Sequence, residues 1–414
     1  MIGLKTRLLL ISGCLLVYVF RLYSVSQSLP QVPTGARVRL VARVSQQPTL
    51  NATNQVITLG SFLVKTSRLP GYDYGQRLEV IGKPTKRLIN SVKSEFVFDY
   101  PSIRIVKQEE SLINQTRVGR FLFNIRGRLE EWILRALPAP HSSLLVGILL
   151  GVKNQLPQEF TQNLRKTGTI HIVVASGYNL SVIAGLLMAL LLRIASRRKA
   201  ALLAILGIWV YAMMVGLEAP IVRAAIMTSL AFLAQILGRE KDASLGLLLA
   251  AMVMLLISPL ILFDIGFQLS FMATAGILLI SPRLTGKAFE LPLVGQDLKT
   301  TLAAQLAVLP ILLANFGECN WLSPFINALI LPVVPLIMFL GLLIIFSSLI
   351  SRLLALVIAW LTWLPLAYMV NLINWFGQHK LGSFWIGKIP FWLAVGYYLI
   401  LSLWIKNSKA SSSA

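Results

Sequence analysis

Residues 160–185 read FTQNLRKTGTIHIVVASGYNLSVIAG, and the organisation of the whole chain follows from this stretch. It begins polar and basic and then enters a long apolar run that ends at Arg193. Polar groups in an otherwise membrane-spanning helix need a hydrogen-bonding partner or a wet cavity, because burying them unpaired costs free energy. The polar side chains inside this run are His171, Ser176, Asn179 and Ser181.

Two glycines, Gly168 and Gly177, interrupt the same stretch. They predict a break in the helix or a close helix contact, where backbone polar groups line a cavity. Each polar residue taken alone is equally explained by hydrogen bonds to neighbouring helices. Several of them within one apolar run favour a lined pathway.

The composition is that of a polytopic membrane protein. The chain is 56% hydrophobic and only 13% charged, with a mean hydropathy of +0.74, which excludes a soluble globular protein. With an anchor helix at residues 1–25, the apolar runs predict about ten spans in an α-helical membrane protein. The other predicted spans lie near residues 170–192, 200–217, 221–238, 244–260, 263–281, 300–316, 325–349, 353–375 and 390–406.

The net charge of +22 is distributed unevenly between the predicted loops. One set of alternate loops collects most of the Lys and Arg, whereas the opposite short loops hold Lys380 and Lys388. Because cytoplasmic loops are enriched in Lys and Arg, both termini are expected in the cytoplasm of a bacterial cell and residues 31–108 outside it.

Residues 31–108 differ from the rest because they are polar and strand-like. Period-two runs separated by Gly and Pro predict an inserted, extracytoplasmic small β-barrel of the OB type. Twelve Lys and Arg against four Asp and Glu favour an anionic partner, either nucleic acid or lipid headgroups. Interleaved aromatic side chains suit base stacking, although most are expected in the core. The DNA-binding candidates are Arg37, Arg39, Lys65, Arg68, Tyr72, Tyr74, Lys86, Arg87 and Lys93.

Residues 112–152 predict a basic amphipathic helix that lies in the membrane interface and binds lipids, followed by a short re-entrant helix. Residues 160–406 then form the transmembrane domain, and residues 407–414 a polar tail.

Further polar groups lie within the predicted spans. Arg223 and Asp264 could pair, which lowers the cost of burying either one. The alternative is a wet passage, whose uncharged polar groups and few acids suit an anionic polymer better than a cation. The candidates for lining such a passage are His171, Ser176, Gly177, Asn179, Arg223, Asp264, Gln268, Ser270, Gln305 and Asn327.

Catalysis is not expected from this chain. Two cysteines and three scattered histidines form no metal motif, and no phosphate-binding glycine loop or nuclease motif is present, so no cofactor is expected. Ala175-Ser176-Gly177 is similar to a nucleophile turn, which leaves an intramembrane hydrolase using Ser176 as an alternative, but its base is not identifiable.

Four ordered blocks of the sequence are Phe160–Gly177, Ala219–Ala224, Asp264–Phe271 and Gln305–Pro310. Together they resemble the ComEC competence family, the inner-membrane DNA-uptake channel. The β segment, with Phe98-Asp99-Tyr100 after its last predicted turn, resembles the extracytoplasmic OB domain of that family.

The resemblance implies that one strand of incoming DNA crosses the cytoplasmic membrane of naturally transformable bacteria through the polytopic domain. It implies single-stranded DNA, an outside DNA receptor and a cytoplasmic ATP-driven translocase as partners. The positions that match the channel of the family are His171, Ser176, Gly177, Arg223, Asp264, Gln268 and Ser270.

Two departures from the family pattern stand out. Asn179 follows Ser176-Gly177-Tyr178 where the family commonly has His, and Asn can hydrogen-bond but cannot titrate. No His-x-His-x-Asp-His run is present, so degradation of the other strand is expected from a separate nuclease. Apart from the resemblance, the residues leave open a transporter or flippase of another anionic envelope component.

Overall fold

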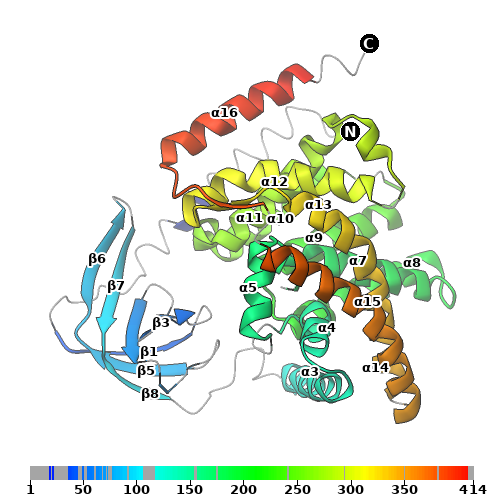
Figure 1. The fold of residues 1–414 in the computed structure, drawn as a ribbon, viewed down its shortest axis with the longest axis horizontal. Helices are drawn as coiled ribbons and strands as arrows, with labels where there is room; N and C mark the ends of the chain where they lie inside the picture. The colour runs from blue at the N-terminus through cyan, green and yellow to red at the C-terminus, as the bar shows by residue number, and fades with distance from the viewer. Residues whose placement is uncertain are drawn as a thin grey trace. The chain divides into compact units, whose positions relative to one another are not determined.

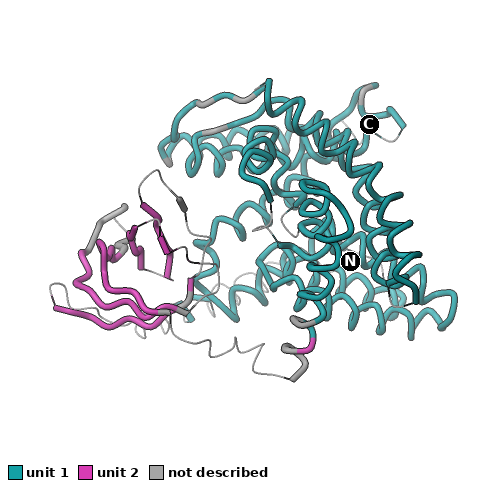
Figure 2. Tube along the Cα trace, turned by 60° about the horizontal axis from the view of Figure 1, so that its bottom comes forward, with its two compact units in different colours: residues 1–22, 122–414 teal, residues 23–121 magenta. Residues whose placement is uncertain are grey.

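The computed structural model (Figure 1) describes most of the chain. The described residues are 18–19, 21–22, 36–44, 49–50, 54–59, 62–67, 69–70, 72, 77–90, 93–105, 117–152, 156–173, 176–239, 242–292, 294–348, 350–379 and 382–408. Figure 2 shows two compact units, one of residues 23–121 and one of residues 1–22 with 122–414. The first unit contains residues 31–108 of the predicted strand-rich insertion, and the second contains residues 160–406 of the predicted transmembrane domain.

The described part of residues 23–121 consists of short strands in two sheets. β4 and β7 run parallel, and the other described neighbours run antiparallel. The first sheet has the order β1 (Val38–Arg43), β5 (Arg77–Gly82) and β8 (Ser102–Ile105). The second has the order β2 (Thr49–Leu50), β3 (Asn54–Leu59), β4 (Phe62–Ser67), β7 (Lys93–Asp99) and β6 (Thr85–Asn90).

One apolar core joins the two sheets. Leu78 and Val80 of β5 pack with Ile57 of β3 and Phe98 of β7, all fully buried. Alternate residues of β3 are buried, as a period of two requires for a strand with one face on a core. The pairings of the described strands close no barrel, so the OB-like barrel is not confirmed and a small sheet region is what the structure shows.

The described part of residues 122–414 is almost entirely helical. Its first half contains α3 (Arg117–Ala136, which begins in the other unit), α4 (His141–Leu150), α5 (Gln158–Lys166), α6 (Ile170–Val173), α7 (Gly177–Leu191), α8 (Arg197–Val215), α9 (Ala219–Ile236) and α10 (Ala243–Ile257). Its second half contains η1 (Pro259–Phe263), α11 (Ile265–Leu279), η2 (Ser281–Arg283), η3 (Lys287–Glu290), α12 (Gly295–Asn315), β9 (Glu318–Asn320), α13 (Ser323–Ile330), η4 (Leu331–Val333), α14 (Val334–Ser348), α15 (Arg352–Gln378), β10 (Ser383–Trp385) and α16 (Phe391–Ser408).

Six segments of the described chain are long and apolar enough to cross a membrane, and they identify a multi-pass membrane protein. They are 197–215, 219–236, 265–283, 295–315, 323–348 and 352–378, and each overlaps a predicted span. α7 and α10 are shorter apolar helices. Ten spans are thus not confirmed by helix length alone.

The predicted span near residues 170–192 is interrupted. α6 ends at Val173, and α7 begins only at Gly177. Ser176 caps α7, because its Oγ accepts a hydrogen bond from the backbone N–H of Asn179. The break that the glycines and polar residues indicated is therefore real.

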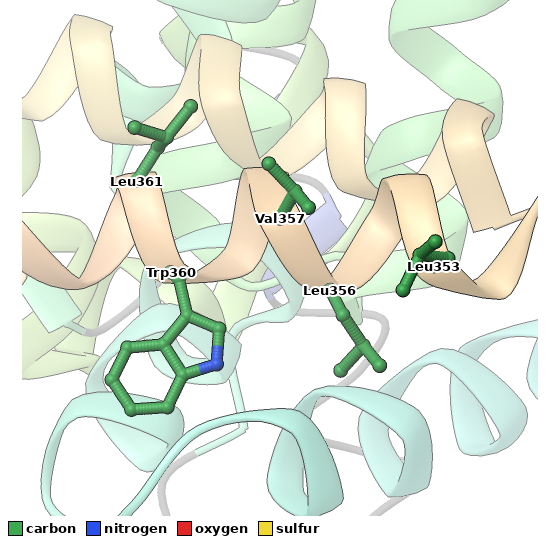
Figure 3. A pocket seen from close by; sticks show the side chains of 5 residues that line it. All are labelled: Leu353, Leu356, Val357, Trp360 and Leu361. Carbon is green, nitrogen blue, oxygen red and sulfur yellow. The ribbon is translucent and has the colours of Figure 1, made fainter.

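The outer faces of the helices are apolar. α14 and α15 pack against each other (Figure 1). α15 also leaves an open groove of about 520 Å³ (Figure 3), and Leu353 and Leu361 beside it are 73% and 62% exposed. Such a surface is unfavourable in water but contacts lipid chains favourably in a bilayer. The groove is lined by Leu353, Leu356, Val357, Trp360 and Leu361.

Candidate functional site

Asn179 holds three helices together at the break between α6 and α7. It is 1% exposed, and its Nδ2 donates to the backbone oxygens of Ile148 at 3.1 Å and Ile172 at 3.3 Å. The Oγ of Ser176 donates to Asn179 Oδ1 at 3.1 Å. The amide is therefore satisfied on both sides, so Asn179 stabilises the break and is not open to a passage.

The guanidinium of Arg223, from α9, lies against Gly177 at the start of α7. A Cβ atom added at Gly177 would lie 2.5 Å from Nη2 of Arg223 and 3.3 Å from the Cβ of Ala224. A side chain at this position would therefore push the guanidinium away from the start of α7. Nε of Arg223 is buried and has no hydrogen-bonding partner, and no ion pair joins Arg223 to a described carboxylate.

Glu218 is the acid nearest to Arg223 in the sequence, but its charge interacts with Arg126. Arg126 of α3 donates from Nη1 to the backbone oxygens of Met214 at 2.9 Å and Val215 at 3.3 Å, where α8 ends. Burial lowers the pKa of Arg126, whereas the nearby carboxylates of Glu130 and Glu218 raise it. The charge of Glu218 thus supports the anchoring of α3.

His171 lies beside the break with an exposed side chain. Its Nδ1 is 3.0 Å from the backbone oxygen of Gly168. Gly168 has a φ of +72°, and a Cβ there would come within 2.4 Å of Ser323 Oγ, so the turn before His171 packs tightly on α13. The hydroxyl of Ser176 is engaged with Asn179, and no hydrogen bond joins the described atoms of Ser176 and His171.

A polar seam runs from this turn to α12 and α13. Gln305 Nε2 donates to the backbone oxygen of Asn320 at 2.8 Å, and Asn320 Nδ2 donates to the backbone oxygen of Lys166. Asn327 Nδ2 donates to Ser323 Oγ at 3.1 Å, while its Oδ1 is buried without a partner in the described structure. The seam consists of Lys166, Gly168, Gln305, Asn320, Ser323 and Asn327.

The candidates on α11 do not join this group. Asp264 caps α11 by accepting from the N–H of Phe267 at 2.8 Å, and Gln268 Nε2 donates to the backbone oxygen of Leu262 at 2.9 Å. The carbonyl of Ser270 accepts from Thr274 Oγ1 at 3.0 Å. Asp264 forms no ion pair with Arg223 among the described residues, so the pair considered from the sequence is not formed.

Three basic candidates of the sheet region are described with their side chains. Arg37 is exposed. Arg39 forms an ion pair with Glu79, yet its own side chain is 73% exposed. Lys65 lies on β4 opposite Asp99 of β7 in the parallel register. Two of the three cations thus lie beside a carboxylate.

Tyr72 is not available for stacking. It is 8% exposed and belongs to the core between the two sheets, and burial raises the pKa of its hydroxyl. This candidate is therefore corrected from a DNA contact to a core residue. Arg68 and Tyr74 lie outside the described residues, as do the side chains of Lys86, Arg87 and Lys93.

Sequence reasoning missed two contacts that join distant parts of the helical unit. Asn163 is 2% exposed and donates from Nδ2 to Asn374 Oδ1 at 3.0 Å, which ties α5 to α15. Asn320 links Lys166 to α12. The signal for Asn374 was available, because it is an amide in the apolar run of residues 353–375.

Comparison with known proteins identifies a family and a relative that this chain resembles. A family model described as "Competence protein" matches residues 148–409. "ComE operon protein 3" of Bacillus subtilis (strain 168) is 26% identical over 212 residues, which are 51% of this chain. The match spans 27% of that relative's length. No solved structure matches the chain.

Proposed function

The chain belongs to the competence protein family, and from that premise we propose that its helical unit is the channel through which single-stranded DNA enters the cytoplasm. The family indicates a role in DNA uptake during transformation. The assignment of a channel rests on the break between α6 and α7 and on the charge beside it.

Arg223 is the observation that carries the proposal. Its guanidinium lies against Gly177, the first residue of α7, without a described carboxylate beside it. A guanidinium binds phosphate through parallel hydrogen bonds, and the free N–H groups of a helix start also favour anions. A half-buried cation without a partner is costly, and a passing phosphodiester would supply the missing charge.

Contacts between helix ends support the predicted orientation. If Arg197 at the start of α8 is cytoplasmic, α8 ends outside, where Arg126 binds it. Arg21 donates to Leu256 at the end of α10, which also falls outside. Arg283 donates to the backbone oxygen of Ile405, so the ends of α11 and α16 share the cytoplasmic side.

The pairing of β9 with β10 fits the same topology. β9 follows α12 and β10 follows α15, and both helices end outside in this arrangement. We therefore keep about ten crossings as a proposal, with α7, α10, α16 and the N-terminal anchor added to the six long segments. The sheet region, proposed as OB-like, then lies outside, where it would receive DNA from a surface receptor.

The energy and the nuclease would come from separate proteins, an ATP-driven translocase and a nuclease. The chain itself is proposed to have no enzymatic activity. The hydrolase alternative gains no support from the site, because the hydroxyl of Ser176 is committed to Asn179 and has no described base.

Uptake of labelled DNA tests the proposal in cells that lack the gene and are complemented with variants. Arg223→Gln should reduce DNA entry about tenfold or more, because charge-assisted hydrogen bonds contribute about 1.5–3 kcal/mol. Arg223→Lys should retain part of the activity. The exposed Arg198 on the cytoplasmic side offers a matched control, and Arg198→Gln should import at the wild-type rate.

Two results would count against the proposal. Wild-type entry with Arg223→Gln would remove Arg223 from the path. Normal DNA entry in the deletion strain would refute the channel itself and leave the transporter or flippase of another anionic envelope component as the leading function.

A further inference from the structure

Two large aromatic side chains stand exposed on the short sheet of β9 and β10. Trp321, directly after β9, is 73% exposed, and Phe384 of β10 is 56% exposed. Phe384 lies opposite Cys319 in the antiparallel register, and Trp321 follows Cys319 by two residues. The backbone N–H of Trp321 donates to the backbone oxygen of Gly382 at 2.9 Å, so Trp321 and Phe384 lie two residue pairs apart along the same pairing of segments.

The backbone around Trp321 is tied to the polar seam. The preceding residue, Asn320, hydrogen-bonds to the backbone of Lys166 and accepts from Gln305. Ser323, two residues after Trp321, is the residue against which Gly168 packs. Trp321 therefore stands at the end of the seam that leads through the turn at Gly168 toward His171 and the break.

The segments that contact this short sheet carry three cations. Arg165 is exposed and Lys166 is half-buried at the end of α5, and Lys388 is exposed. The backbone of Lys388 borders Gly317, because a Cβ at Gly317 would lie 3.1 Å from Lys388 N. Exposed aromatic rings among cations are how proteins hold single strands without reading their sequence.

We propose that Trp321, with Phe384 beside it, is a stacking platform for the bases of the incoming strand, while Arg165, Lys166 and Lys388 attract its phosphates. The proposal rests on the proposed function and gives its entry point. Stacking on an indole suits a DNA importer because every base offers a π face, so binding tolerates any sequence.

Lipid contact is the competing role for an exposed tryptophan in a membrane protein. Trp360 provides the comparison, because it is 60% exposed and lines the apolar groove of α15 among leucine and valine side chains (Figure 3). Trp321 differs from it in directly following Asn320 of the seam, on a segment that contacts the backbone of the segments that carry Lys166 and Lys388. These neighbours favour a nucleic acid over a lipid chain.

Binding of two fluorescent probes to the purified full-length chain in phosphatidylcholine nanodiscs tests the platform. One probe is a single-stranded oligothymidine, and the other is an abasic strand of equal length and charge. Trp321→Leu keeps an apolar side chain but cannot stack, so it should weaken oligothymidine binding about tenfold and leave binding of the abasic strand unchanged. Trp321→Phe should stay within about twofold of wild type, and so should Trp360→Leu.

Each other outcome overturns the inference. Unchanged oligothymidine binding by Trp321→Leu excludes stacking, and an equal loss for both probes assigns Trp321 to lipid contact or folding. Equal losses for Trp321→Leu and Trp360→Leu lead to the same conclusion. If the wild-type chain binds neither probe, the proposed DNA channel fails together with the stacking platform. If the wild-type chain binds both probes and Trp321→Leu changes neither, only the stacking platform fails.

Discussion

Replacing Gly177 with alanine should displace Arg223 without unfolding the protein. The added Cβ would lie 2.5 Å from Nη2, and ordinary contact begins at 3.4 Å, so the guanidinium must move by about 0.9 Å. Nη2 ends a flexible side chain, which makes this movement inexpensive. Alanine also favours a helix over glycine by up to about 1 kcal/mol. The free energy of unfolding should therefore change by less than about 1 kcal/mol.

The functional effect should be larger than the effect on stability. A shift of this size misaligns a bidentate phosphate contact, which depends on the planar geometry of the guanidinium. Losing about 1 kcal/mol of that contact corresponds to a roughly fivefold fall in DNA entry. The assay is the cytoplasmic accumulation of labelled DNA, normalised to the amount of protein in the membrane.

Gly185 on the same helix supplies the control, because nothing lies within 4 Å of a Cβ added there. Gly185→Ala should import at the wild-type rate. The double variant Gly177→Ala/Arg223→Gln should import no less than Arg223→Gln alone, because the guanidinium is already absent. A further loss in the double variant, or equal behaviour of Gly177→Ala and Gly185→Ala, would refute the reasoning.

Three further predictions concern stability. Gly168→Ala should lower the free energy of unfolding by about 2 kcal/mol or more, since its φ is +72° and Ser323 blocks the Cβ; an unchanged melting temperature in detergent would contradict this. Asn179→Ala should cost about 1–3 kcal/mol by leaving two buried carbonyl oxygens unpaired, a loss that thermal unfolding in detergent would detect. Tyr72→Ala should destabilise the sheet region by about 3–5 kcal/mol, which faster proteolysis of that region would show. A selective loss of DNA binding with normal proteolysis would instead identify Tyr72 as a DNA contact. Burial raises the pKa of Tyr72, so the folded sheet region favours the neutral hydroxyl. The stability that Tyr72 contributes is therefore present below about pH 10 and is lost as pH rises through the folded-state pKa. A pH series of the same proteolysis assay would show this loss.

Polar residues in apolar runs proved to be of two kinds. Asn179, Gln305 and Gln268 hydrogen-bond to backbone oxygens. The bond of Asn179 to Ile148 is of the kind that the alternative of hydrogen bonds between neighbouring helices predicted. Arg223 has no such described partner. Sequence reasoning could not separate these kinds, because an amide and a guanidinium are equally conspicuous in an apolar run whatever lies beside them.

The sequence alone determined the membrane class, the strand-rich insertion and the positions of the six long spans. These follow from composition and periodicity, which act over one helix or one strand at a time. It also indicated the break near Gly177, since glycine and a helix-capping serine are local signals. Only the tertiary structure decided that Arg223 lies on Gly177, that Tyr72 is in a core and that Trp321 borders the polar seam. Those facts depend on which segments, tens to hundreds of residues apart, pack together, and helix packing in a bilayer is set by the fit of side chains that no local pattern records.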